Sequence, residues 1–178
     1  MIPIPGIVIA VLTFPGVIVH EAAHAFFCRL FKTPVLEVKY FQFKNPAGYV
    51  IHGQAEGIKA QFFITMGPFI INSAFCVLFC SAAFLPIWVF SAKDPVAWFF
   101  YWLGLSIGMH AFPSTQDLKV LWRSTKEELK GFSPWAIASL PLIGILYPLN
   151  FLRIIWADLG YGIAIGVLAP LAIFKLMA

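Results

Sequence analysis

The residues best suited to chemistry form one short pattern near the start of the chain, His20-Glu21-Ala22-Ala23-His24. On a helix, His20 and His24 lie one turn apart on the same face, so their imidazoles can bind one divalent metal ion. Glu21 then lies beside the metal, where its carboxylate can take a proton from a water molecule that the metal activates. This spacing is typical of zinc hydrolases, and it predicts Zn²⁺ as the cofactor and Glu21 as the catalytic base.

The pattern lies inside an apolar segment. Residues 2–19 contain no charged side chain, and Ala25, Phe26 and Phe27 follow the second histidine. Ionisable groups at membrane depth are unfavourable and are therefore usually functional. The alternative is a pair of ordinary core histidines, which we disfavour because burying two His and one Glu in lipid without a role costs free energy.

The composition is that of an integral membrane protein. Of the 178 residues, 61% are hydrophobic and only 11% are charged. The apolar runs are long enough for helices, so we expect an all-α polytopic membrane protein in the lipid bilayer. The net charge of +4 comes from basic residues beside apolar segments, which indicates membrane orientation and not nucleic-acid binding. Three cysteines within apolar segments argue against a disulfide framework.

The histidine pattern must be positioned by transmembrane helices, and the apolar segments predict about five of them. Their expected ranges are 4–31, 60–90, 96–112, 134–155 and 159–177. Pro15-Gly16 predicts a kink in the first. Alternating residues at 35–43 and 49–54 predict a small membrane-associated β-hairpin, with a plain connecting loop as the alternative. Residues 118–132 predict a polar, amphipathic helix. We expect a single membrane-embedded domain over 1–178, with a catalytic core at about 4–120 and supporting helices at about 134–177.

Lysine and arginine are unevenly distributed among the expected loops. Most lie in two stretches separated by two expected spans: Arg29, Lys32, Lys39, Lys44 and Lys59 in the first, and Lys119, Arg123, Lys126 and Lys130 in the second. The positive-inside rule places both stretches in the cytoplasm. The N-terminus is then outside, and the histidine pattern lies toward the cytoplasmic face.

The distribution of lysine and arginine also places candidate third ligands at the membrane depth of the two histidines. Catalytic zinc typically has three protein ligands and one open position. Asp117 is favoured by its depth and side, His110 is the alternative, and His52 on the expected hairpin is more distant. If Asp117 or His110 binds the metal, the other is expected to orient a ligand.

Residues of about 10–120 resemble the site-2 protease family of intramembrane zinc metalloproteases. The pattern His20–His24 matches the family's metal motif, and Gly67-Pro68 with Asn72 looks like its Gly-Pro…Asn element. Gly48-Tyr49-Val50 looks like part of its membrane-associated sheet. Residues 113–117 resemble a variant of the family element whose Asp is the third ligand, although no Asn precedes Pro113 and no Gly follows Asp117. A PDZ domain does not fit in this length, so the chain resembles a minimal form.

The resemblance implies hydrolysis of peptide bonds in a membrane protein that has a transmembrane segment, in a prokaryotic cell membrane. It implies zinc bound by His20, His24 and Asp117, with Glu21 as the base. The residues that it assigns to the substrate are Asn72, Gly67, Pro68, Tyr49 and Val50. Two alternatives stay open: a non-proteolytic metal-binding membrane protein such as a transporter or sensor, and an inactive scaffold. The absence of a sequence repeat disfavours a transporter, and the intact metal pattern disfavours a scaffold. The sequence does not predict the oligomeric state.

Overall fold

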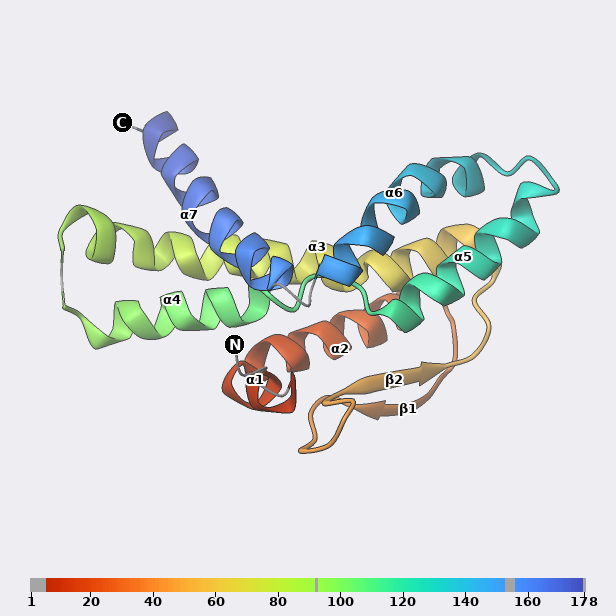
Figure 1. Cartoon of the computed structure of the whole chain (residues 1–178), viewed down its shortest axis with the longest axis horizontal. Coiled ribbons are helices and arrows are strands. Elements are labelled where there is room, and N and C mark those ends of the chain that lie inside the picture. Colours follow the sequence, from red (N-terminus) through yellow and green to blue (C-terminus); the bar gives the residue numbers. More distant parts are fainter. Residues whose placement is uncertain (1–5, 92, 153–155, 178) are drawn as a thin grey trace.

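The computed structural model describes residues 6–91, 93–152 and 156–177, which are mostly helical with one small sheet (Figure 1). In chain order, the elements are α1 (Gly6–Leu12), α2 (Phe14–Leu30), β1 (Val35–Lys39), β2 (Tyr49–His52), α3 (Gly57–Phe84), the short π-helix η1 (Leu85–Val89), α4 (Pro95–Gly108), α5 (Thr115–Leu129), α6 (Pro134–Phe151) and α7 (Ala157–Met177).

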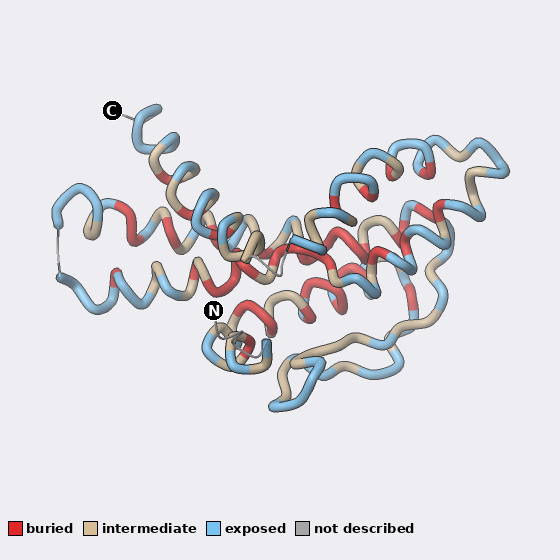
Figure 2. Tube along the Cα trace, viewed as in Figure 1, coloured by how far each residue is buried: buried red, intermediate tan, exposed pale blue. Residues whose placement is uncertain are grey.

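Helix α3 is the central element of the fold. It packs against α2, α4, α5, α6 and α7, whereas α6 and α7 diverge from each other on one side of it (Figure 1). Helices α4 and α5 together run back along α3, and the turn between them lies near the middle of the molecule. The buried residues follow the inner faces of α2, α3 and α4, and large parts of α6 and α7 are exposed (Figure 2).

Three helices in the described part of the chain are long and apolar enough to cross a membrane: α3 with η1, α6 and α7. Exposed apolar side chains such as Leu78, Ile145 and Leu168 are suited to contact with lipid. The structure is therefore consistent with a membrane protein. The prediction of five spans is not confirmed, because α4 has only 14 residues and the first segment is broken.

The break in the first segment lies at Thr13. Helices α1 and α2 meet there at an angle of 89°. Together they could form one membrane span only if that span is sharply bent. The Thr13 hydroxyl donates to the Ile9 carbonyl of α1, and Pro15 lies in the first turn of α2, where its missing N–H is tolerated. The predicted kink at Pro15-Gly16 is therefore a sharper break two residues earlier.

The predicted β-hairpin is confirmed, with shorter strands than expected. Strands β1 and β2 are antiparallel, with Val38 opposite Val50 and Lys39 opposite Tyr49. Both strands contact α2. The Tyr49 hydroxyl donates to Glu37 across the strands at 2.6 Å, which helps to hold their register.

Small residues allow α3, α4 and α7 to approach closely. A Cβ at Gly104 would lie 2.6 Å from Cys80 Sγ, and one at Gly108 would lie 2.6 Å from Cys76 Sγ. These cysteines are free and fully buried. Close backbone packing through small residues is a common way for helices to associate in membranes.

Candidate metal centre

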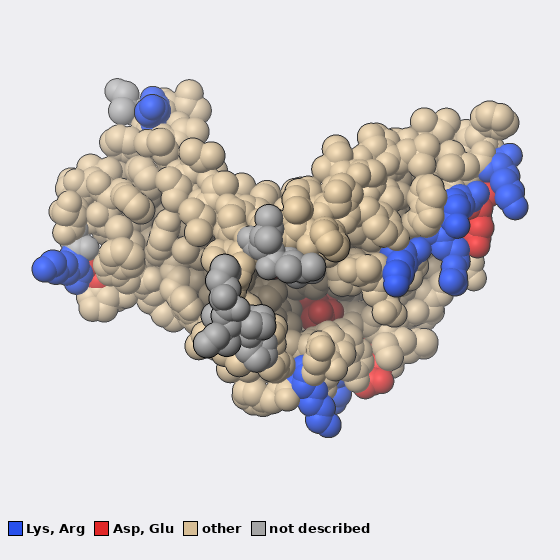
Figure 3. Space-filling view, in the orientation of Figure 1, with Lys and Arg blue, Asp and Glu red and all other residues tan. Residues whose placement is uncertain are grey.

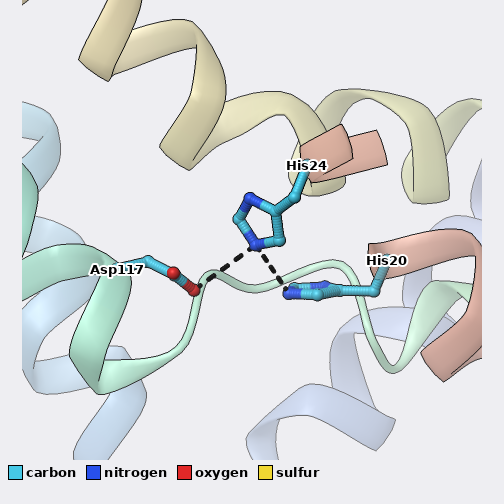
Figure 4. Close-up of side chains that lie close together, drawn as sticks. All are labelled: His20, His24 and Asp117. Carbon is cyan, nitrogen blue, oxygen red and sulfur yellow. Dashed lines mark hydrogen bonds and ion pairs between the residues drawn. The ribbon is translucent and has the colours of Figure 1, made fainter. Parts of the chain in front are cut away.

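The side chains of His20, His24 and Asp117 converge on one point (Figure 4). Each contributes one ligand atom, and these atoms all lie within 4.8 Å of one another. His24 Nε2 is 3.2 Å from His20 Nε2 and 3.5 Å from Asp117 Oδ2. Ligands of a tetrahedral zinc ion at about 2.0–2.1 Å lie roughly 3.3 Å from one another, so this spacing suits a bound metal ion.

The hydrogen bonds of the two histidines determine which ring nitrogen is available. His20 Nδ1 is 2.6 Å from the His110 carbonyl, and His24 Nδ1 is 2.8 Å from the Ile64 carbonyl. A carbonyl oxygen only accepts, so both Nδ1 atoms must be protonated, and in the neutral rings both Nε2 atoms bear lone pairs. Two lone pairs and a carboxylate oxygen then face one another, which is a donor set that could hold a cation.

Asp117 is positioned by the start of α5. Ser114 is the N-cap of that helix: its hydroxyl accepts from the Asp117 N–H at 3.2 Å, and Asp117 Oδ2 accepts from the Ser114 N–H at 2.7 Å. This reciprocal capping box holds the carboxylate beside His24. Burial acts to raise the pKa of the Asp117 carboxyl, but the nearby His24 and the Ser114 hydrogen bond lower that pKa below its ordinary value. The carboxylate is therefore charged and able to bind a cation.

Glu21 lies at the junction of two cavities beside the three ligands. The larger cavity, of about 700 Å³, is lined by the three ligands, by Glu21, by residues 114–116 and by 46 and 48–52 of the hairpin. The smaller one, of about 160 Å³, extends from Glu21 toward Ala10 and Phe112. Acidic atoms lie in a recess in the middle of this face of the molecule (Figure 3). The Glu21 carboxylate, a group of side chains that could hold a metal ion and a cavity therefore occur together.

The hairpin approaches the base closely at Gly48. A Cβ there would lie 2.7 Å from Glu21 Cγ and 3.0 Å from Val17 Cγ1. Only glycine allows the chain to pass this near the carboxylate side chain. Tyr49 and Val50, which follow in β2, line the larger cavity, and their contact with a substrate stays a prediction.

The residues predicted as competing ligands lie outside the three-residue group. The His110 ring contacts Thr13 Oγ1 through Nε2 at 2.8 Å, and its carbonyl accepts from His20. His110 therefore contacts His20 through its backbone carbonyl, while its ring is turned to Thr13. His52 lines the larger cavity, but its Nδ1 is turned to the Gly53 carbonyl at 2.7 Å.

The predicted substrate residues of α3 are buried and line neither of the two cavities beside Glu21. Asn72 is fully buried, and its two Nδ2 hydrogens are shared among the carbonyls of Gly16, Ile107 and His110, which lie 3.1–3.2 Å from Nδ2. Pro68 is also fully buried. Their contact with a substrate stays a prediction, and their contacts within the chain point to a different role, argued below.

Sequence reasoning missed three groups that support the centre. Ser114 is one, although the spacing Ser114-x-x-Asp117 is itself a capping-box signal. The others are the carbonyls of Ile64 and His110. The Ile64 carbonyl could have been found from Pro68, because a proline leaves the carbonyl four residues before it without a helical partner. No sequence signal marks the His110 carbonyl, because its contact with His20 depends on how α2 and the turn after α4 meet.

Comparison with known proteins adds no family assignment: no family model, no curated protein and no solved structure matches this chain.

Proposed function

We propose that the chain is an intramembrane metalloprotease that hydrolyses peptide bonds of membrane-spanning or membrane-associated proteins near the cytoplasmic face. The observation behind this proposal is that Glu21 lies next to a group of three convergent ligands, at a cavity of about 700 Å³ bordered by a β-strand. The resemblance to the site-2 protease family, through His20–His24 and Gly67-Pro68 with Asn72, favours the same function.

The ligand set favours zinc. Two imidazole nitrogens and one carboxylate oxygen are typical donors for a catalytic zinc ion, and they leave one position open. A zinc ion bound there supplies a Lewis acid for the scissile carbonyl and lowers the pKa of water. His20, His24 and Asp117 would hold the ion, and their hydrogen bonds to backbone groups keep their donor atoms in place.

Glu21 is the group that moves the proton. Its side chain borders both cavities and is 8% exposed, so it is accessible to a water molecule while being shielded from bulk solvent. As a base, the carboxylate takes the proton of the attacking water. As an acid, it then delivers that proton to the nitrogen of the departing amine.

Strand β2 is a suitable binding surface for the substrate backbone. A peptide bond in a helix is shielded by its own hydrogen bonds, so a membrane-spanning substrate must become extended near the site of cleavage. Tyr49 and Val50 line the cavity on β2, and an extended peptide can add to the edge of such a two-stranded sheet.

The test is Glu21→Gln in the full chain, reconstituted in lipid vesicles with zinc and a membrane-spanning substrate. Loss of general acid–base catalysis should lower the rate of hydrolysis by at least about 10²-fold, with zinc content unchanged. Glu127→Gln is the matched control, since Glu127 is exposed on α5 away from the ligands. Full activity in Glu21→Gln would refute this mechanism. A zinc-loaded wild type that cleaves no substrate would favour a non-proteolytic metal protein.

A further inference from the structure

We propose that the α3 segment from Gly67 to Asn72 positions both metal-binding histidines and thereby sets the metal affinity of the centre. The sequence resemblance assigns these residues to the substrate, whereas their contacts lead to the imidazoles. The proposal rests on the metal centre of the proposed function, and it holds whether or not that centre cleaves peptide bonds.

Pro68 makes a carbonyl available to His24. In an α-helix the N–H of residue 68 would bond to the carbonyl of Ile64, but proline has no N–H. The Ile64 carbonyl therefore lacks its helical partner, and it accepts instead from His24 Nδ1 at 2.8 Å. This bond selects the tautomer of His24 that presents Nε2 to the metal.

Asn72, one turn later on α3, acts on the other histidine. Its Nδ2 atom donates to the His110 carbonyl at 3.2 Å, and the same carbonyl accepts from His20 Nδ1 at 2.6 Å. Asn72 also donates to the carbonyls of Gly16 on α2 and Ile107 on α4. One amide thus joins three segments at the point where the His110 carbonyl must face His20.

Gly67 allows α2 to lie close enough for these bonds. A Cβ at Gly67 would lie 2.3 Å from Cδ2 of Phe27, which is three residues after His24 on α2. Any larger residue would have to displace the Phe27 ring from α3, and we expect this to lengthen the bond from His24 to the Ile64 carbonyl. Gly67, Pro68 and Asn72 therefore all help to position the imidazoles of the two histidines.

The burial of Asn72 supports a positioning role over contact with a substrate. Its side chain is fully buried, and its Oδ1 atom has no hydrogen-bond partner within the described residues. Because Asn72 also lines neither cavity beside Glu21, the amide is better explained by what its Nδ2 atom donates to.

Pro68→Ala separates this role from a merely structural one. Alanine restores an N–H that competes for the Ile64 carbonyl, and it is a far better helix former than proline. We expect the unfolding temperature of the metal-free chain to stay the same or rise, while zinc affinity falls by about 10- to 100-fold. Affinity is measured by competition with a chelator, on the purified full chain in detergent with zinc alone. Pro141→Ala, at an exposed interior proline of α6, is the control and should leave affinity unchanged.

Asn72→Leu tests whether Asn72 supports His20 through the His110 carbonyl. Loss of the amide should lower zinc affinity by a similar factor, and it should alter the visible spectrum of the Co²⁺-loaded chain, because His20 loses the support of its acceptor. Gln61→Leu removes another buried amide of α3, which bonds to Thr65, and should leave the spectrum unchanged. Zinc affinity within twofold of wild type in Pro68→Ala would overturn the proposal, as would an equal loss in Pro141→Ala. If Asn72→Leu does not fold, Pro68→Ala decides.

These outcomes are distinct from failure of the proposed protease function. A wild-type chain that binds zinc but cleaves nothing, and whose affinity falls in Pro68→Ala, would refute proteolysis and support this inference. A wild-type chain that cleaves normally, with zinc affinity unchanged in Pro68→Ala, would support proteolysis and refute this inference.

Discussion

At the scale of single residues, the candidate metal centre depends on which ring nitrogen of each histidine is available to a cation. The carbonyls of His110 and Ile64 occupy the two Nδ1 positions, so both Nε2 atoms face each other and Asp117. This arrangement assigns different roles to two residues that the sequence leaves in competition. Asp117 offers a side-chain oxygen, whereas His110 offers its backbone.

That difference predicts opposite results for two alanine variants. Asp117→Ala removes a ligand and should lower zinc affinity by more than the roughly 10- to 100-fold typical of losing an outer partner. His110→Ala keeps the backbone carbonyl that accepts from His20, so its zinc affinity should fall far less. Zinc content after dialysis against a chelator measures both. A larger loss in His110→Ala would contradict this assignment of ligands.

At the scale of elements, the position of Asp117 beside the two histidines is set by the way in which α5 begins. The chain leaves α4 at Gly108, turns through residues 109–113, and starts α5 with the Ser114–Asp117 capping box. On its other side, α5 buries Leu118 and Leu121 in clusters with residues of α3 and α6. The cap and this apolar face together set the position of Asp117 relative to α2.

Ser114→Ala should therefore affect both stability and metal binding. Loss of an N-cap hydroxyl costs about 1 kcal/mol in free energy of unfolding, measured here on the metal-free chain. The Asp117 carboxylate would keep its bond to the Ser114 N–H but lose the reciprocal partner, so zinc affinity should also fall. Ser124→Ala, in the middle of the same helix, is the control and should change neither quantity appreciably. Equal behaviour of the two variants would show that the capping box does not position Asp117.

At the scale of the whole molecule, the charges separate along α3. Basic side chains gather over α5 and the hairpin, whereas Lys93 lies at the opposite end, in the link between η1 and α4 (Figures 1 and 3). Helix α3 with η1 has 33 residues, which corresponds to about 50 Å at 1.5 Å per residue. This exceeds the roughly 30 Å apolar core of a bilayer, so the two ends should emerge on opposite sides.

Cysteines placed at the two ends test this orientation. In sealed vesicles, an impermeant thiol reagent should label Lys130→Cys and Lys93→Cys from opposite sides of the membrane. The native cysteines Cys28, Cys76 and Cys80 are fully buried, so the unmodified chain should react little and serves as the control. Labelling of both positions from the same side would show that α3 does not cross the membrane.

The local patterns of the sequence were enough to predict the parts of this structure that depend on near neighbours. The spacing of His20 and His24 predicts two imidazoles on one helical face, and strand alternation predicts the β1–β2 hairpin, because both follow from the backbone geometry of a few residues. The charge count brought Asp117 to the depth of the histidines through an assumed set of five spans. Those spans are not confirmed as such, since α1 and α2 meet at 89° and α4 is short.

What only the tertiary structure decided is how distant carbonyls and side chains meet. Sequence spacing cannot show that the His110 carbonyl faces His20 across 90 residues, or that Pro68 releases the Ile64 carbonyl at the point where His24 reaches it. Those contacts depend on close helix approach at Gly16 and Gly67, which is a property of packing between elements. The sequence by itself therefore determined that His20, Glu21 and His24 lie together on one helix, because this is local, while packing brought Asp117 to the two histidines and gave α3 its contacts with both of them.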